Sequence, residues 1–254
     1  MSSDIGKIVR KIVRKAKVIT KANRRPRRGP WPPAPARVRS IIDGLEELYP
    51  DVDCELDRES PFQLVIATIL SAQTTDDRVN MVTPELFRRY PTPEAMAKAP
   101  LPTLEKIIRS TGFFRNKAKS IKGAAAALSE RFGGEVPRTL AELITLPGVA
   151  RKTANVVLGT AYGLAEGVVV DTHVQRLSMR LGFTRATDPK DIEKDLMKVI
   201  PHENWIRFSH QVIWHGRKLC VARMPKCVEC PLENICHAAD KTWSMVEVHK
   251  SARP

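Results

Sequence analysis

Apolar residues recur at three- and four-residue spacing along most of the chain, and this period predicts helices. Many of the periodic stretches open with a cap-like residue or an early proline, and several end at glycine or proline. The β-like run at residues 168–170 is too short to found a sheet. The pattern therefore predicts an all-α protein of about ten helices, at Val38–Leu48, Pro61–Leu70, Thr75–Tyr90, Leu101–Ser110, Asn116–Phe132, Thr139–Leu143, Ala150–Tyr162, Thr172–Leu181, Pro189–Val199 and Ser209–Leu219.

The first 36 residues follow a different pattern. Residues 5–19 place apolar side chains at helical spacing with lysine and arginine on the other face, which predicts a cationic amphipathic helix. Residues 20–36 combine arginine pairs with repeated proline, and proline interrupts helices, so we expect an extended linker there. The folded unit is expected to begin near Arg37, and residues 241–254 are expected to form a short frayed tail.

Charge follows the same division. The chain carries 42 Lys+Arg and 28 Asp+Glu, a formal net charge of +14. Residues 1–39 hold 13 of the basic residues and one acidic residue, which leaves 29 basic and 27 acidic residues in the other 215. The body of the protein is therefore nearly neutral. No stretch has the roughly 20 apolar residues of a membrane-spanning helix, and the N-terminus lacks the apolar core of a secretory signal, so we expect an intracellular protein that does not enter a membrane.

Four of the five cysteines fall within one short segment and predict a metal centre. Cys220, Cys227, Cys230 and Cys236 have the spacing C-x6-C-x2-C-x5-C. Thiolates suit either a tetrahedral zinc ion or an iron–sulfur cluster. Structural zinc sites usually contain two close pairs of ligands, whereas this segment has one close pair and two distant single cysteines, so the spacing favours a [4Fe–4S] cluster. Cys54 is expected to be an ordinary free cysteine.

The loop between the first two of these cysteines carries Arg223 and Lys226 and no acidic residue. Two interpretations stay open. Either the loop presents both cations to a phosphate, or it is a solvated loop whose positive charge offsets that of the thiolates.

Residues 146–155, with the sequence LPGVARKTAN, lie between two predicted helices. Pro147 and Gly148 interrupt the first helix, Gly148 permits a positive φ, and the next helix begins at once with its N-terminal N–H groups in the turn. Such a hairpin can bind a phosphate through these donors, with support from Arg151. Short turns of this kind are also common between packed helices, so the turn alone does not decide its role.

Lys152 and Asp171 are candidate catalytic residues. A lysine is a nucleophile only when uncharged, so Lys152 requires a desolvated site or positive neighbours such as Arg151. Asp171 follows an apolar run and precedes residues 172–174, where it can cap a helix. Its carboxylate can also stabilise positive charge that develops on a sugar ring. The alternative interpretations are a solvated base and an ordinary cap.

Four motifs in this order resemble the endonuclease III family of the helix-hairpin-helix DNA glycosylase superfamily, over about residues 37–240. They are ILSAQTTD at 69–76, LPGVARKTANVV at 146–157, VDTHV at 170–174 and the four-cysteine spacing. The resemblance implies a two-lobed, all-helical fold that binds DNA in a cleft. It places a six-helix domain with the hairpin at about 54–164, and a discontinuous domain with a [4Fe–4S] cluster at 37–53 plus 165–240.

The resemblance also implies an activity, in which oxidised pyrimidines such as thymine glycol are excised and the strand is then cut at the abasic site. Lys152 matches the family's catalytic lysine, which displaces the base and forms a Schiff base that undergoes β-elimination. Asp171 matches the catalytic aspartate. The damaged nucleotide must leave the stack, and Gln73 matches a residue that fills the gap, while Phe113 falls where the family places a bulky wedge. His173 is placed to contact a phosphate or to orient the aspartate.

Two positions depart from the family pattern. Ala150 stands where the usual hairpin has a second glycine, so a positive φ there would strain the backbone and weaken phosphate binding. Phe113 is larger than the aliphatic wedge often seen, which puts the lesion preference in doubt. Two other functions remain as alternatives. One is a monofunctional adenine or mismatch glycosylase, but the lysine at 152 argues against it. The other is a non-catalytic DNA-binding protein.

The expected partner is double-stranded DNA that contains damaged bases, and the enzyme is expected to be a monomer in the bacterial cytoplasm, associated with the nucleoid. For residues 1–36 we favour an arm that adds nonspecific phosphate contacts. An organellar transit peptide and a segment that binds anionic lipid are the alternatives.

Overall fold

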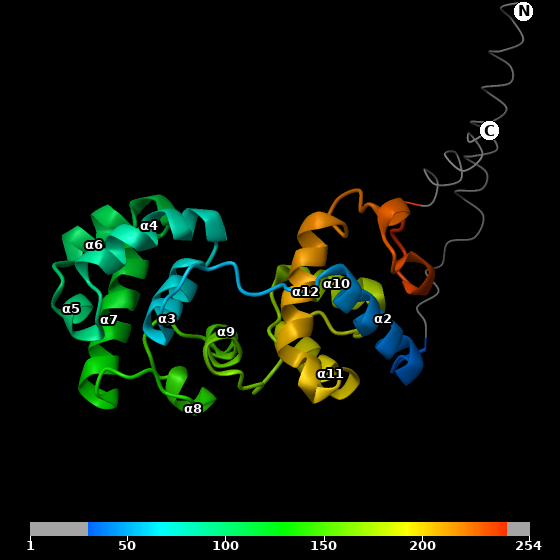
Figure 1. Cartoon of the computed structure of the whole chain (residues 1–254), viewed down its shortest axis with the longest axis horizontal. Helices are drawn as coiled ribbons and strands as arrows, with labels where there is room; N and C mark the ends of the chain where they lie inside the picture. Colours follow the sequence, from blue (N-terminus) through cyan, green and yellow to red (C-terminus); the bar gives the residue numbers. More distant parts are fainter. Residues whose placement is uncertain (1–29, 243–254) are drawn as a thin grey trace, which may run out of the picture. The chain divides into compact units, whose positions relative to one another are not determined.

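The structure is a computed structural model that describes residues 30–242 (Figure 1). Throughout these residues the regular structure is helical and no strand occurs, which confirms the predicted all-α class. The predicted amphipathic helix at 5–19, residues 20–29 of the predicted linker and residues 243–254 of the predicted tail lie outside the described residues. No helix of the described part is long and apolar enough to cross a membrane.

The chain divides into two compact units. One is formed by Asp51–Val169 with Pro201–His210, and the other by residues up to Pro50, Val170–Ile200 and residues from Gln211 onward. The first unit contains α3 (Pro61–Leu70), α4 (Asp76–Arg89), α5 (Pro93–Lys98), α6 (Leu101–Ile107), α7 (Phe114–Phe132), α8 (Leu140–Leu143) and α9 (Arg151–Tyr162). The second contains α2 (Pro35–Leu48), α10 (Thr172–Leu181), α11 (Pro189–Val199) and the larger part of α12 (Trp205–Lys218).

The core of the first unit is built around α3. Nearly every residue of this apolar helix is buried, and it packs against α4, α7 and α9, while α5 and α6 pack against α7. The start of α3 follows from its sequence, because the Ser60 hydroxyl accepts the Gln63 N–H at 3.2 Å and proline occupies the first turn. Thr75 caps α4 and Thr92 caps α5 in the same manner.

The second unit has an amphipathic α2 whose buried face is formed by Val38, Ile41, Ile42 and Leu45. Gly44 of this helix has no room for a side chain, because an added Cβ would lie 2.5 Å from Leu232 Cδ2 in the cysteine segment. Arg37 donates from the start of α2 to the carbonyls of Leu181, at 2.7 Å, and Ile235, at 2.9 Å. The helix and the cysteine segment are therefore packed together closely.

Two predicted boundaries are wrong, and one helix is missing from the prediction. The linker does not reach residue 36, because α2 begins at Pro35, where proline suits the first helical turn. The sequence prediction omits α5, although Thr92-Pro93 repeats the start signal of α3. Ser209 does not open the last helix: α12 begins at Trp205, and the Ser209 hydroxyl donates to the Trp205 carbonyl inside it.

Candidate functional site

The hairpin at 146–155 is a tight turn between α8 and α9. Gly148 has φ +80°, and the Val149 N–H donates to the Leu146 carbonyl at 3.1 Å. Ala150 is the N-cap residue of α9 with φ −89° and ψ 169°, which is ordinary extended backbone. This position does not need a positive φ, so alanine in place of the family's second glycine introduces no strain.

Small residues bring the hairpin against α7 and α3. A Cβ on Gly148 would lie 2.7 Å from Ser120 Cβ, and one on Gly123 of α7 would lie 3.2 Å from Pro147. The turn is therefore fixed by glycine on both sides of the contact. Its position relative to α7 follows from the fold and not from the hairpin sequence.

Arg151 and Lys152 form the first turn of α9, and both side chains are exposed. No side chain caps this helix N-terminus. Exposed cations beside the positive end of a helix are suited to an anionic ligand such as a phosphate. Because Lys152 is exposed, burial by this chain does not supply the desolvated environment that a neutral lysine needs.

Gln73 and Phe113 lie on two loops of the same unit, and both have left-handed backbone, with φ +54° and +46°. Non-glycine residues seldom adopt this conformation. Gln73 is exposed, and Phe113 is 68% exposed at the start of α7. An exposed aromatic ring on strained backbone is available to a ligand and contributes nothing to the core.

Asp171 is the N-cap residue of α10, as its sequence position predicts, and its carboxylate accepts the Val174 N–H at 2.7 Å. It belongs to the second unit, whereas Lys152 belongs to the first. His173, in the first turn of α10, is half-buried: its Nδ1 lies 3.2 Å from Arg176 Nη2, and Gly216 leaves room for both side chains. Nδ1 is therefore engaged within the protein.

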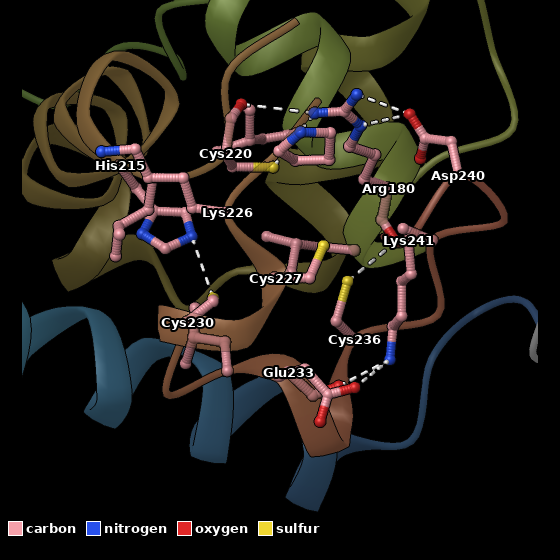
Figure 2. Close-up of a pocket in the computed structure, with 16 residues that line it drawn as sticks. Arg180, His215, Cys220, Lys226, Cys227, Cys230, Glu233, Cys236, Asp240 and Lys241 are labelled. Carbon is pink, nitrogen blue, oxygen red and sulfur yellow. Dashed lines mark hydrogen bonds and ion pairs between the residues drawn. The ribbon is translucent and has the colours of Figure 1, made fainter. Parts of the chain in front are cut away.

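The four clustered cysteines line one pocket, which contains about 460 Å³ of non-protein space, part of it open to solvent (Figure 2). Cys220 lies two residues after the end of α12, Cys227 begins the 3-10 turn Cys227–Glu229, Cys230 follows that turn, and Cys236 follows the 3-10 turn Glu233–Ile235. Among residues 30–242, no three Cys, His, Asp or Glu side chains are grouped closely enough for a single metal ion. Cys54 is a free cysteine in the other unit, as predicted.

Arg180 is the main structural partner of this pocket. Its side chain is 8% exposed and donates to Cys220 Sγ at 3.2 Å, to the Val221 and Ala222 carbonyls, and to Asp240. Burial lowers the pKa of Arg180, but the hydrogen bonds and negative charges of Asp240 and Cys220 raise it by more. The pKa is therefore above its usual value. The guanidinium therefore remains charged and fixes the loop that carries the first cysteine.

His215 contacts the pocket from α12. Its Nε2 lies 3.5 Å from Cys230 Sγ, and its Nδ1 lies 3.1 Å from the Tyr49 hydroxyl. Burial lowers the pKa of His215 to about 4 and raises that of Tyr49 to about 12, so the imidazole is neutral and the hydroxyl keeps its proton. The arrangement that satisfies all three groups has Tyr49 donating to Nδ1 and Nε2 donating to the sulfur.

Burial raises the pKa of Cys230 to about 11, and it raises the pKa of Cys220 and Cys236 as well. Without a ligand these thiols are protonated at neutral pH, and a metal that binds them as thiolates releases protons. Arg223 and Lys226 have exposed side chains on the loop between the first two cysteines, with Met224 between them at φ +55°.

Sequence reasoning missed Arg180, His215 and a buried lysine in the first unit, Lys117. Arg176 and Arg180 stand four residues apart on α10, and both donate to the Cys220 carbonyl. That spacing is visible in the sequence. Nothing near these residues in the chain, however, indicates that their partners lie 40 residues away.

The chain resembles known proteins over most of its length. Residues 66–202 match the profile described as HhH-GPD superfamily base excision DNA repair protein. The chain is 57% identical over 203 residues to endonuclease III of Synechocystis sp., covering 80% of this chain and 93% of the relative. It is 45% identical over 206 residues to endonuclease III of Bacillus subtilis, covering 81% and 94%. A solved non-covalent endonuclease III–DNA complex matches with a TM-score of 0.77 at 44% identity, covering 85% of this chain and 99% of that one.

Proposed function

The chain belongs to the endonuclease III family of helix-hairpin-helix base excision DNA repair proteins, and we propose that Lys152 and Asp171 carry out its reaction. It is a bifunctional enzyme, a DNA glycosylase with AP lyase activity. The observation that carries the assignment is the exposed amine of Lys152 on the first turn of α9, directly after the Gly148 turn.

In the proposed reaction, uncharged Lys152 Nζ attacks C1′ of the damaged nucleotide and the bond from C1′ to the base breaks. The departing base takes up the proton that the attacking amine releases. The sugar ring then opens as the C1′–O4′ bond breaks and O4′ takes a proton, and the product is a Schiff base between Lys152 and C1′. Loss of a C2′ proton then expels the 3′ phosphate by β-elimination. Asp171 stabilises positive charge on the sugar as the base departs. The desolvated site that an uncharged lysine needs would come from displacement of water around Lys152 when DNA binds, with Arg151 as a positive neighbour.

DNA contacts are proposed for three parts of the chain. Gly148 and Arg151 bind a phosphate through the N-terminus of α9. Gln73 fills the gap that the extruded nucleotide leaves, and Phe113 inserts beside it as a wedge. Further phosphate contacts are proposed for three side chains of the second unit, namely His173, Arg223 and Lys226. His173 would use Nε2, because its Nδ1 is engaged by Arg176.

We further propose that the pocket lined by Cys220, Cys227, Cys230 and Cys236 holds a [4Fe–4S] cluster. The donor set supports this, since four thiolates are the usual ligands of such a cluster and all four cysteines line the same pocket. Arg180 and His215 then donate to its sulfur ligands. The cluster would fix the loop that carries Arg223 and Lys226. The substrate class proposed is duplex DNA with oxidised pyrimidines, acted on by a monomer in the bacterial cytoplasm at the nucleoid.

Borohydride trapping tests the role of Lys152. Reduction during reaction on thymine-glycol duplex should join wild-type protein covalently to DNA, and Lys152→Ala should form no adduct and lose base excision by on the order of 10⁴-fold. Its thermal unfolding should match the wild type, because the side chain is exposed. Asp171→Asn keeps a capping side chain but loses the charge, so excision should fall by about 10²-fold or more with little change in stability.

Lys190→Ala is the matched control, because Lys190 is an exposed lysine on the first turn of α11, and this variant should form the covalent adduct with DNA at the wild-type yield. An adduct at full yield in Lys152→Ala would assign the nucleophile to another amine.

A further inference from the structure

Lys117 is a buried lysine of α7 whose ammonium group is surrounded by oxygen atoms. The residue is 6% exposed. Its Nζ donates to the Leu70 carbonyl at 2.8 Å, to the Thr111 carbonyl at 2.7 Å and to the Thr74 hydroxyl at 2.6 Å. These three acceptors use all three donors of an ammonium group. The side chain is therefore held at one point by three separate contacts.

The acceptors belong to the two loops that carry Gln73 and Phe113. Leu70 is the last residue of α3 and Thr74 follows Gln73, while Thr111 stands two residues before Phe113. The Thr74 hydroxyl also donates to the Thr111 carbonyl, so the loops are joined directly as well as through Lys117. One ammonium group thus connects the segments before α4 and before α7.

Both loops hold a non-glycine residue in left-handed backbone. Gln73 has φ +54° and Phe113 has φ +46°. This conformation is unfavourable for a residue with a Cβ, and it persists only where surrounding contacts enforce it. The side chains of Gln73 and Phe113 are exposed, so core packing does not enforce it. Lys117 contacts the side-chain hydroxyl of the residue after Gln73, and the backbone carbonyls three residues before Gln73 and two residues before Phe113.

Burying an ammonium group in a core costs free energy, because the group loses its hydration. Its three partners are uncharged oxygens, and burial lowers the pKa of Lys117. A methionine has similar length and would fill the same space without the loss of hydration. What methionine lacks is the ability to bind three oxygens of two loops at once.

We propose that Lys117 is a positioning residue, which holds Gln73 and Phe113 in the conformations needed to enter the DNA stack when the damaged nucleotide is extruded. The inference rests on the roles proposed above for Gln73 and Phe113. It predicts a selective defect. Extrusion from a duplex should suffer, whereas attack on an abasic site in single-stranded DNA, which has no paired base and no gap to fill, should not.

Four variants test this in the full chain. Lys117→Met removes the donors, and Thr74→Val removes the shared hydroxyl with little change in volume. Lys122→Met is the matched control, because Lys122 lies on the same helix and donates to one carbonyl, that of Ala99, at 2.5 Å. Gln73→Ala, combined with Phe113→Ala, tests the underlying roles.

Three measurements are made on each variant. The first is the single-turnover rate of base excision from thymine-glycol duplex, and the second is the β-elimination rate on single-stranded abasic DNA. The third is the fluorescence of 2-aminopurine placed next to the lesion, which reports unstacking. We expect Lys117→Met to lower duplex excision by about 10- to 100-fold and to reduce the fluorescence rise, with single-stranded elimination unchanged. Thr74→Val should show a smaller loss of the same kind.

An equal loss on both substrates, or an equal loss in Lys122→Met, would overturn the proposal in favour of a general structural role. Normal duplex excision in Lys117→Met and Thr74→Val, with a defect in the Gln73 and Phe113 variant, would overturn it and leave those two roles intact. If the Gln73 and Phe113 variant is itself normal, those roles fail and the inference fails with them. Should Lys117→Met not fold, Thr74→Val decides between the same outcomes.

Discussion

The hairpin at 146–155 and the cysteine segment at 220–236 are held in place differently. The hairpin is closed mainly by its own residues, through the left-handed Gly148 and the bond between Val149 and Leu146. The cysteine segment depends on Arg180 and His215, which donate to its sulfur atoms from two helices. The first segment exposes its candidate nucleophile, whereas the second lines a pocket.

This difference indicates separate roles, in which the hairpin presents a residue for the reaction and the cysteine segment contributes to the stability of the fold. A turn that is closed locally can present an exposed lysine without cost to the core, so changes at Lys152 should affect reaction and not folding. A segment with little regular structure needs partners from elsewhere and, as we propose, a bound cluster. Changes there should affect folding first and reaction as a consequence.

The largest effect on stability is expected from loss of a cysteine. Cys227→Ser should remove the proposed cluster and lower the free energy of unfolding by on the order of 5 kcal/mol, because ligand binding is coupled to folding of the segment. Iron and sulfide content, visible colour and thermal unfolding measure this. Cys54→Ser is the control, since this cysteine lies outside the pocket. A colourless wild-type protein that carries zinc would contradict the cluster assignment.

Arg180→Met should have the next largest effect. The change leaves the Val221 and Ala222 carbonyls without their donor and the half-exposed Asp240 carboxylate without its ion pair. We expect a cost of about 3 kcal/mol, most of it from the carbonyls that lose their hydrogen bonds. Urea unfolding of the cluster-loaded protein measures it. Arg39→Met, on the exposed face of α2, should be nearly neutral. If both variants unfold at the same urea concentration, the segment does not depend on Arg180.

Gly148→Ala should destabilise the hairpin by about 1–3 kcal/mol, because it combines a positive φ with a Cβ 2.7 Å from Ser120 Cβ. Gly163→Ala separates the two causes, since Gly163 has φ +66° and open space around its Cβ position. It should cost only the smaller, conformational part. Adding Ser120→Gly to Gly148→Ala should recover the difference. No recovery would show that the hairpin is fixed by backbone conformation alone.

The smallest effect on stability and reaction is expected from deleting residues outside both the hairpin and the cysteine segment. Deletion of residues 1–29 removes 11 of the 42 basic residues and keeps Pro35 at the start of α2. Folding and trapping should be unchanged. The slope of log affinity for duplex DNA against log salt concentration should become shallower by about 0.9 for each phosphate that the shortened protein no longer binds. An unchanged slope would refute a DNA-binding role for this segment.

Much of the helical pattern could be predicted because helix signals are local. The Ser60 and Asp171 caps and the start of α9 follow from residues within one turn of each other. The errors at Pro35 and Ser209 arose because proline and serine can each play two different structural roles at a helix. Proline ends a helix or begins one, and serine caps a helix or bonds back inside it.

The helical class, the hairpin and the group of four cysteines follow from the sequence, because each depends on residues that are close together in the chain. How Ala150 is accommodated, and which residues support the site without belonging to a motif, depends on the packing of the folded chain. Arg180, His215 and Lys117 have partners 60, 166 and 47 residues away, respectively. Hydrogen bonds at such separations follow from how the helices pack, and a local pattern carries no information about them.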